Sequence, residues 1–344
     1  MAPRAFITGI VGLELSSDEE AFLREADPWG MILFKRNISD PKQVTELTSS
    51  FRSVLGRHVP VLVDQEGGRV QRLGPPNWPV YPPAQAFDRL YERDPAAGLA
   101  AARLGGRLLA ADLQPLGIDV DCLPCADIPV SEADPVIGDR AYGDRPDKVA
   151  VLAGAHARGL MNGGVLPVLK HLPGHGRATA DSHKSLPTVE ADRGTLEATD
   201  FAAFRPLARL PLGMTAHVVF SAIDAAHPAT TSATMVGEVI RGFIGFEGLL
   251  MSDDVSMGAL SGTIGERSKA AIAAGCDVVL HCNGKLDEMQ EVAASVPRLS
   301  GEAARRAGAA LAARETPSEF DAVAGRRVFE DMLAPVWKAG EAVA

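Results

Sequence analysis

The chain has little of several residue types that mark particular protein classes. Only four of its 344 residues are cysteines, too few for a disulfide scaffold of this length. No stretch reaches the roughly 18 consecutive apolar residues that a membrane-spanning helix needs. Lysine and arginine (34) are outnumbered by aspartate and glutamate (44), which gives a net charge of −10. Because an acidic chain repels phosphate backbones, we expect no nucleic-acid partner, and we expect no membrane partner either.

Two local features bear on the compartment. Cys122 and Cys125 form a C-x-x-C pair, but no second pair follows at zinc-ribbon spacing. We therefore expect these cysteines to be small, buried, apolar side chains, and the protein to lie in a reducing compartment. Near the start of the chain, Glu14 interrupts a short apolar run and no A-x-A cleavage site follows. This pattern favours a first strand over a signal peptide and predicts a cytoplasmic protein.

The residues that are present indicate a globular fold with many short elements. The chain is 46% hydrophobic and 23% charged, and it contains 34 glycines and 24 prolines. Glycine and proline exceed their usual combined share of about 12%, which indicates many turns. Eight short apolar runs recur along the chain and are continuous rather than alternating, as in strands buried on both faces of a parallel sheet. These runs are 5–10, 30–34, 59–64, 117–122, 165–170, 212–217, 248–253 and 277–282.

Helical patterns separate these runs. Asp40-Pro41 and Asp94-Pro95 each place an N-cap residue before a proline at the first helical position. Arg145-Pro146 opens a third helix that ends at Gly163-Gly164, helices are expected within 231–245 and 265–275, and residues 301–341 predict two more. Strands alternating with helices predict the α/β class, as a (β/α)8 TIM-type barrel forming a single domain over 1–344 with C-terminal helices. An open doubly wound sheet is the alternative, weakened because no G-x-G-x-x-G follows the first strand.

Polar residues follow the predicted strands, at the ends where barrels of this type build their active sites. An ion-pair layer closing the barrel mouth would also place charges there, but convergence of the whole set favours a site for a polar ligand. The residues concerned are Lys35, Arg36, Asn37, Asp64, Gln65, Glu66, Asp127, Lys170, His171, His217, Asp253, Asp254, His281 and Asn283.

The densest polar segment is 170–187. His171 and His175 have the i, i+4 spacing of a helical metal site, but Pro173 and Gly174 between them break any helix, so we expect no metal. In Asp181-Ser182-His183, the carboxylate can orient one ring nitrogen and leave the other free for proton transfer, although a surface Asp–His pair would look the same.

Asp253 and Asp254 end the seventh run. Neighbouring residues of a strand point to opposite sides, so both carboxylates cannot face one pocket while the strand continues. We expect one of them to serve chemistry and the other to cap the following turn.

Together these motifs resemble the glycoside hydrolase family 3 β-N-acetylglucosaminidases, cytoplasmic enzymes that recycle peptidoglycan. The matching strings are ILFKRN (32–37), DQEGGRVQR (64–72), IGDRAYG (137–143), KHLPGHGRATADSH (170–183), AH (216–217) and SDDVSM (252–257). They lie in the family's order across nearly the whole barrel. The family usually has Phe at Leu172, Glu at Asp139 and Leu at Val255, and Asp139 is expected to shift the neighbouring arginine slightly.

The resemblance implies a role for each matching residue. Asp253 would be the nucleophile that forms a glycosyl-enzyme, and His183, paired with Asp181, would be the general acid and then the general base. An unperturbed histidine pKa of about 6.5 suits that work. The N-acetylglucosamine ring would be held by Asp64, Arg72, Arg140, Lys170 and His171.

The implied activity is exo-hydrolysis, with retention, of terminal non-reducing N-acetylglucosamine from peptidoglycan-derived (anhydro)muropeptides, without a cofactor. A phosphorylase is a close alternative, because histidine repels phosphate less than a carboxylate does. A metal-dependent amidohydrolase barrel would share the fold and the histidines and aspartates at the strand ends. A sugar-binding barrel without catalytic activity would also place polar residues there.

Overall fold

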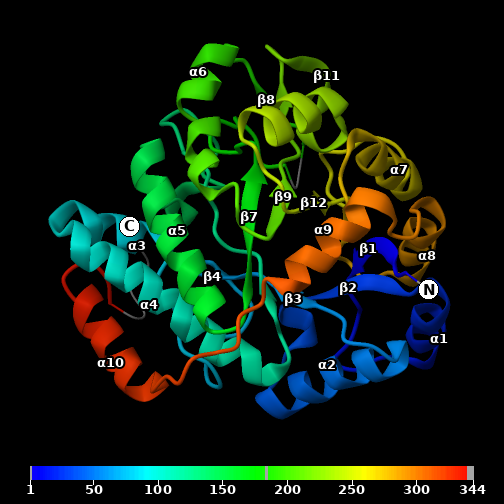
Figure 1. Ribbon diagram of the computed structural model, residues 1–344, viewed down its shortest axis with the longest axis horizontal. Helices are drawn as coiled ribbons and strands as arrows, with labels where there is room; N and C mark the ends of the chain where they lie inside the picture. Colours follow the sequence, from blue (N-terminus) through cyan, green and yellow to red (C-terminus); the bar gives the residue numbers. More distant parts are fainter. Residues whose placement is uncertain (1, 183–184, 339–344) are drawn as a thin grey trace.

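The computed structural model describes residues 2–182 and 185–338. Eight parallel strands close into a barrel in the order β1-β13-β12-β9-β7-β6-β3-β2 (Figure 1). The strands are β1 (Arg4–Thr8), β2 (Pro28–Leu33), β3 (Val61–Val63), β6 (Val120–Asp121), β7 (Leu166–Leu172), β9 (Leu212–Thr215), β12 (Leu249–Asp254) and β13 (Val278–His281). Each of the eight apolar runs contributes one of them.

The barrel prediction is confirmed, and the open-sheet prediction is wrong. The first strand, β1, pairs with β2 on one side and with the last strand, β13, on the other, so the sheet closes on itself. Every residue of β2 and of β7 is buried, which explains their continuous apolar sequence. The extent of the domain, 1–344, stays a prediction because the last six residues lie outside those described.

Helices surround the barrel and begin where the sequence predicts. The Asp40 side chain accepts a hydrogen bond from the backbone of Gln43, and Asp94 caps its helix in the same way. The segment predicted over 231–245 winds as a π-helix, η7 (Met235–Phe243). The α-helices are α1 (Ser17–Ala26), α2 (Pro41–Leu55), α3 (Ala84–Arg93), α4 (Pro95–Leu113), α5 (Pro146–Asn162), α6 (Arg193–Ala198), α7 (Ile264–Ala274), α8 (Leu286–Ser295), α9 (Gly301–Ala312) and α10 (Ala322–Leu333).

Short extra strands enlarge the connections between the barrel strands. A hairpin of β4 (Gln65–Gly67) and β5 (Val70–Gln71) follows β3, and it carries the string 64–72. A three-stranded sheet joins β8 (Thr188–Val189), β10 (Val219–Phe220) and β11 (Asp224–Pro228). The sequence predicted none of these five strands.

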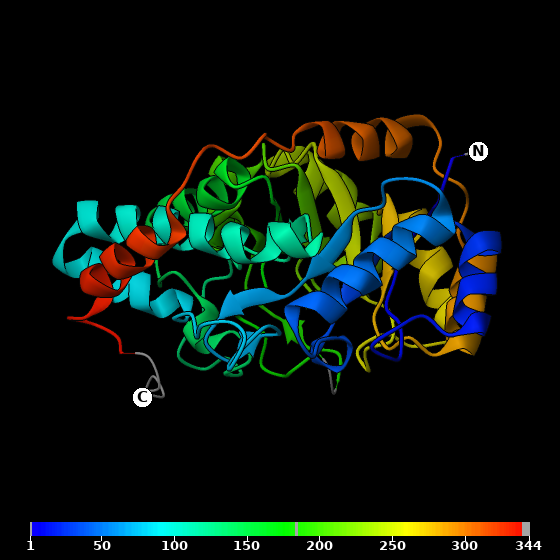
Figure 2. The same ribbon diagram turned by 90° about the horizontal axis from the view of Figure 1, so that it is seen from below.

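The C-terminal helices pack on the outside of the barrel. Helix α9 crosses the face opposite the long loops (Figure 2), where Arg306 pairs with Asp277 beside the start of β13. Helix α10 lies against α3 and α4, and its Arg326 bonds Asp112. The amino-terminal end of the barrel is therefore covered by α9, and a ligand reaches the barrel from the carboxyl end.

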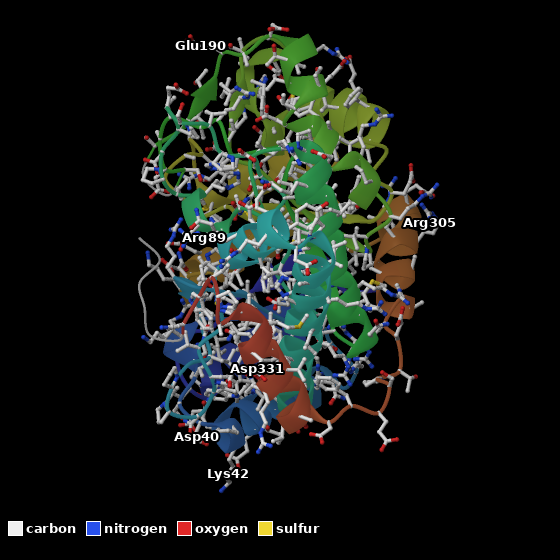
Figure 3. The ribbon with its side chains drawn as sticks, turned by 90° about the vertical axis from the view of Figure 1, so that its left-hand side faces the viewer. Asp40, Lys42, Arg89, Glu190, Arg305 and Asp331 are labelled. Atoms are coloured by element: carbon white, nitrogen blue, oxygen red, sulfur yellow. The ribbon has the colours of Figure 1, made fainter. Side chains whose placement is uncertain are left out.

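The outer surface is polar, and the thiols are inside. Charged side chains such as Lys42, Arg305 and Asp331 project outward from the helices (Figure 3). All four cysteines are buried and unpaired, which confirms their expected role as small core side chains. Among the residues described, we find no helix with the length and apolar character needed to cross a membrane.

Candidate active site

A cavity of about 240 Å³ opens at the carboxyl end of the barrel. Its floor is apolar, formed by Ile32, Met214 and Leu280 from three barrel strands. A larger hollow of about 590 Å³ lies elsewhere, between β11 and α7, but small apolar residues make up most of its lining. Six residues singled out from the sequence line the smaller cavity together, namely Asp64, Arg72, Arg140, Lys170, His171 and Asp253.

Two carboxylates and one ammonium group form the centre of the polar wall. The Nζ of Lys170, at the end of β7, lies 3.0 Å from Asp64 Oδ1 and 2.6 Å from Glu66 Oε1. Lys170 is only 2% exposed, so its charge is balanced by these two side chains rather than by water. Lys170 therefore joins the loop after β3 to the end of β7.

Two arginines complete this network. Arg140 donates two parallel hydrogen bonds of 2.8 Å to Glu66, from Nε to Oε2 and from Nη2 to Oε1. Arg72 donates from Nη2 to Asp64 Oδ2 at 2.9 Å, and its guanidinium lies over the Phe34 ring. Bidentate pairing of this kind fixes orientation as well as charge. The network holds each polar group at a set place before any ligand arrives.

The network also keeps its members ionised. Burial by itself would raise the pKa of Glu66, but Arg140 and Lys170 outweigh it and lower that pKa to about 2. Burial acts on Asp64 in the same direction, and Lys170 and Arg72 hold its pKa well below the usual range. The two carboxylates in turn raise the pKa of Lys170 despite its burial. Asp64 is thus an acceptor and Lys170 a donor at ordinary pH, as a sugar's hydroxyl groups require.

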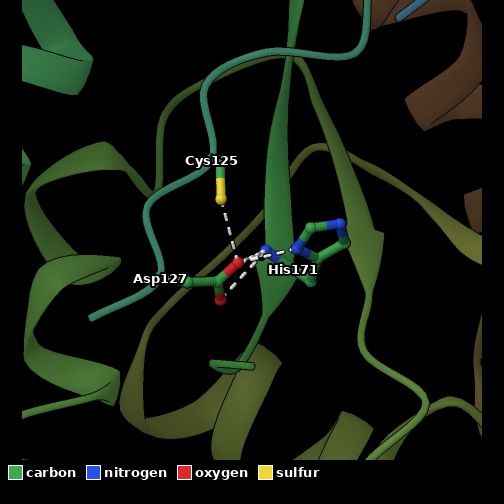
Figure 4. Close-up of side chains that lie close together, drawn as sticks. All are labelled: Cys125, Asp127 and His171. Carbon is green, nitrogen blue, oxygen red and sulfur yellow. Dashed lines mark hydrogen bonds and ion pairs between the residues drawn. The ribbon is translucent and has the colours of Figure 1, made fainter. Parts of the chain in front are cut away.

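His171 reaches the cavity from the opposite side of the β7 terminus. Its Nδ1 lies 2.7 Å from Oδ2 of Asp127, a fully buried carboxylate in the loop after β6 (Figure 4). Cys125 donates to the same oxygen from its Sγ at 3.1 Å.

Cys125, Asp127 and His171 are residue types that can bind metal, and their ligand atoms lie within 4.8 Å of one another. The separations of 2.7 and 3.1 Å are hydrogen-bond distances, however, and burial raises the pKa of the Cys125 thiol well above its ordinary value. A protonated thiol is a poor metal ligand. The chemistry of this cluster therefore fits a hydrogen-bonded network better than a metal centre.

The two aspartates at the end of β12 have different hydrogen-bond partners. Asp254 accepts from Ser256, through its backbone N at 2.9 Å and its Oγ at 2.6 Å, and from the backbone N of Cys282 at 3.1 Å. Asp253 lines the cavity, and its backbone N donates to Thr215 Oγ1 at 3.3 Å. Both aspartates line the cavity, but the carboxylate of Asp254 is engaged by the turn that follows, so we expect Asp253 to be the one that meets a ligand.

Of the other two predicted catalytic residues, only Asp181 is among the residues described. Asp181 is half-buried and is not part of the cavity lining. His183 lies outside the described residues. Ser182 between them accepts from Ala259 through its carbonyl, and its Oγ lies 3.0 Å from His175 Nε2. Burial lowers the pKa of His175 to about 4, so this ring is neutral and unsuited to carry a charge.

Three further residues complete the polar wall but carried no assigned role in the sequence. Glu66 holds Arg140 and Lys170, Asp127 holds His171, and Arg69 pairs with Asp139 at 3.0 Å. This last contact replaces the expected effect of Asp139 on Arg140, which Glu66 holds instead. The sequence could have predicted Glu66, because it lies two residues after Asp64. Residues i and i+2 of an extended segment point to the same side, so both carboxylates can face the same cavity wall.

A barrel that gathers ionised donors and acceptors, apolar side chains and two further carboxylates in one cavity has the architecture of a glycoside hydrolase. The chain belongs to glycosyl hydrolase family 3, whose N-terminal domain matches residues 8–310. This membership agrees with the resemblance and leaves the amidohydrolase and the non-catalytic sugar-binding barrel without support.

The chain is similar to known members of this family. It is 41% identical over 279 residues to a beta-hexosaminidase of Alkalilimnicola ehrlichii, covering 80% of this chain and 79% of that protein. It is also similar to NagZ of Neisseria gonorrhoeae in complex with N-trifluoroacetyl-D-glucosamine, with a TM-score of 0.83 and 31% identity, over 98% of this chain and 97% of NagZ. A structure of NagZ in complex with zinc ion gives a TM-score of 0.82 and 31% identity, over 98% of each chain. The protein is therefore a glycosidase of the beta-hexosaminidase type.

Proposed function

We propose that this protein is an exo-acting, retaining β-N-acetylglucosaminidase. It removes terminal non-reducing N-acetylglucosamine from peptidoglycan-derived (anhydro)muropeptides in the cytoplasm. The observation that carries the proposal is the position of Asp253, whose carboxylate lines the same small cavity as the five residues expected to hold the sugar. The complex of NagZ with an N-acylated glucosamine supports the choice of sugar.

The reaction takes place in two displacements. Asp253 attacks the anomeric carbon, and the bond to the leaving oxygen breaks as His183 gives that oxygen a proton. His183 then takes a proton from water, and the oxygen of that water displaces Asp253 from the sugar. Asp181 orients the imidazole and stabilises its protonated form. Asp64, Arg72, Arg140, Lys170 and His171 bind the ring.

Mass spectrometry of a trapped intermediate tests the nucleophile. A 5-fluoro glycosyl fluoride of N-acetylglucosamine slows the second displacement, so the glycosyl-enzyme should accumulate on the peptide that contains Asp253. Asp253→Asn should remove the label, and Asp254→Asn serves as the matched control, because that residue closes a turn. A label on Asp254 or on Glu66 would contradict the assignment.

A second assay separates hydrolysis from phosphorolysis. p-Nitrophenyl N-acetyl-β-glucosaminide is incubated in phosphate buffer and in a phosphate-free buffer, and the sugar products are analysed. Free N-acetylglucosamine in both buffers supports the hydrolase. N-acetylglucosamine 1-phosphate formed only in phosphate would identify the phosphorylase instead.

A further inference from the structure

Asp127 is a buried carboxylate that the proposed reaction does not use. It has no exposed surface, and within 2–182 and 185–338 no arginine or lysine bonds to it. Burial by itself would raise the pKa of this carboxyl, but the hydrogen bonds from His171 and Cys125 oppose that effect, and the pKa lies well below its usual range. Its oxygens accept from four groups. Oδ2 accepts from His171 Nδ1 at 2.7 Å and from Cys125 Sγ at 3.1 Å, while Oδ1 accepts from the backbone N of His175 at 2.6 Å. The backbone N of His171 lies farther away, at 3.3 Å.

These contacts place a proton on Nδ1 of His171. An ionised carboxylate has no proton to donate, so the ring must donate from Nδ1. A neutral imidazole with its proton on Nδ1 has a lone pair on Nε2. In Figure 4 the second ring nitrogen points away from Asp127, and His171 lines the cavity. In the neutral ring, Nε2 therefore offers the cavity an acceptor.

We propose that Asp127 is a positioning residue, which fixes the tautomer of His171 so that Nε2 accepts a hydrogen bond from a hydroxyl group of the bound sugar. This proposal rests on the proposed function for the identity of the ligand. It adds a second kind of acceptor to a wall that otherwise consists of donors and ionised carboxylates. A carboxylate behind a histidine, setting ring orientation and tautomer, is a recurrent arrangement in enzyme sites.

The variant Asp127→Asn reverses the polarity of this contact. The backbone N–H of His175 can only donate, so the amide oxygen of the asparagine stays on that side. The amide nitrogen then faces His171 Nδ1, which must become the acceptor, and the proton moves to Nε2. The cavity now receives a donor where the wild type offers an acceptor, with nearly unchanged volume and shape.

Nitrogen NMR of the unliganded protein with ¹⁵N-labelled histidine reads the tautomer directly. The chain has eight histidines, and the signals lost in His171→Gln identify that ring. We expect the wild-type proton on Nδ1 and the Asp127→Asn proton on Nε2. A wild-type proton on Nε2 would overturn the proposal, and the wild-type measurement needs no substrate. Its outcome is therefore independent of whether the protein hydrolyses N-acetylglucosaminides.

Kinetics test the consequence for binding. We expect KM for p-nitrophenyl N-acetyl-β-glucosaminide to rise about 10- to 100-fold in Asp127→Asn, with a smaller change in kcat. Deoxyfluoro substrates sharpen the test, because fluorine cannot donate a hydrogen bond. At one ring position, fluorine in place of hydroxyl should weaken wild-type binding much more than it weakens Asp127→Asn binding.

Cys125→Ala is the matched control, because it removes a donor from the same Asp127 oxygen without touching His171. We expect its tautomer, KM and fluorine dependence to match the wild type. If Cys125→Ala reproduces the Asp127→Asn kinetics, the effect is a general disturbance of packing and the positioning role is refuted. If Asp127→Asn discriminates against fluorine as the wild type does, the same conclusion follows.

Discussion

Replacing Lys170 by methionine tests the central ion network in two ways at once. Methionine is of similar length but carries no charge, so it fills the space and removes the ammonium group from between Asp64 and Glu66. Each carboxylate then keeps a single cation, Arg72 for Asp64 and Arg140 for Glu66. We expect the variant to fold, to be less stable, and to bind N-acetylglucosamine-like lactams more weakly.

The magnitude follows from the burial of the network. The pKa of Glu66 is about 2 instead of 4.5, and at about 1.36 kcal/mol per pKa unit this corresponds to roughly 3 kcal/mol of stabilisation, shared between Arg140 and Lys170. Removing one partner of a buried ion pair typically costs about 3–5 kcal/mol. Because an arginine remains on each carboxylate, we expect about 3 kcal/mol, or a fall in Tm of roughly 4 °C for a chain of 344 residues.

The loss should depend on pH in a defined direction. A carboxyl group whose pKa is lowered by folding stabilises the protein above its unfolded pKa, and this stabilisation disappears as the pH falls toward the folded pKa. For Glu66 that window runs from 4.5 down to about 2. Calorimetry should therefore find the Tm gap between wild type and Lys170→Met constant near pH 7 and shrinking as the pH falls below 4.5.

Lys148→Met provides the matched control. Lys148 is similarly buried, at 4% exposed, and lies 2.8, 2.8 and 3.0 Å from Asp88, Glu92 and Asp144, away from the cavity. This variant should lose stability but keep its affinity for the lactam. A Lys170→Met protein with wild-type Tm at pH 7, or with a gap that widens on acidification, would refute the reasoning.

Three further predictions concern the site. Arg140→Ala should raise Ki for the same lactams, measured by competition against an aryl glycoside, with little change in kcat; unchanged Ki would place the pocket elsewhere. Prolonged dialysis against EDTA should leave the hydrolysis rate unchanged, since no metal is expected in the reaction, and a loss restored by zinc would contradict this. His183→Ala should cripple hydrolysis of the natural disaccharide, by about 10²–10⁴-fold, and spare the first displacement on activated aryl glycosides, with azide partly restoring the second. Asp181→Ala should show the same pattern more mildly. The measurement is kcat/KM as a function of the pKa of the leaving group, and a slope unchanged in His183→Ala would assign proton donation to another residue.

The barrel was predictable because its strands obey a simple rule. A strand covered on both faces must be apolar throughout, and each of the eight runs became one barrel strand. The caps at Asp40 and Asp94 were predictable because they depend only on neighbouring residues. The side chain before the proline accepts a hydrogen bond from a backbone N–H group in the first turn of the helix. The hairpin of β4 and β5 escaped notice because its residues are held by contacts distant in sequence, among them the bond from Arg140 to Glu66.

Six of the eight residues predicted for the site line one cavity, but the sequence does not show how they are connected. Polar residues at strand ends, together with the resemblance to a family, brought six residues to one cavity. The sequence cannot tell that Glu66 joins Arg140 to Lys170, or that Asp127 supports His171, because such pairs lie about 40 to 100 positions apart. Strand geometry predicts that Asp253 and Asp254 turn in opposite directions, but both line the cavity, and only their hydrogen-bond partners distinguish them.

The position of helix α9 across the amino-terminal end of the barrel has a consequence for substrate entry and product release. With α9 across that end and apolar side chains from the barrel strands, Ile32, Met214 and Leu280, lining the cavity, we expect the same opening to serve for entry and for exit. The sugar at the bottom cannot depart until whatever was attached to it has left. Released N-acetylglucosamine then occupies the place that the next substrate needs, so the concentration of this product sets a ceiling on the rate at which the enzyme turns over.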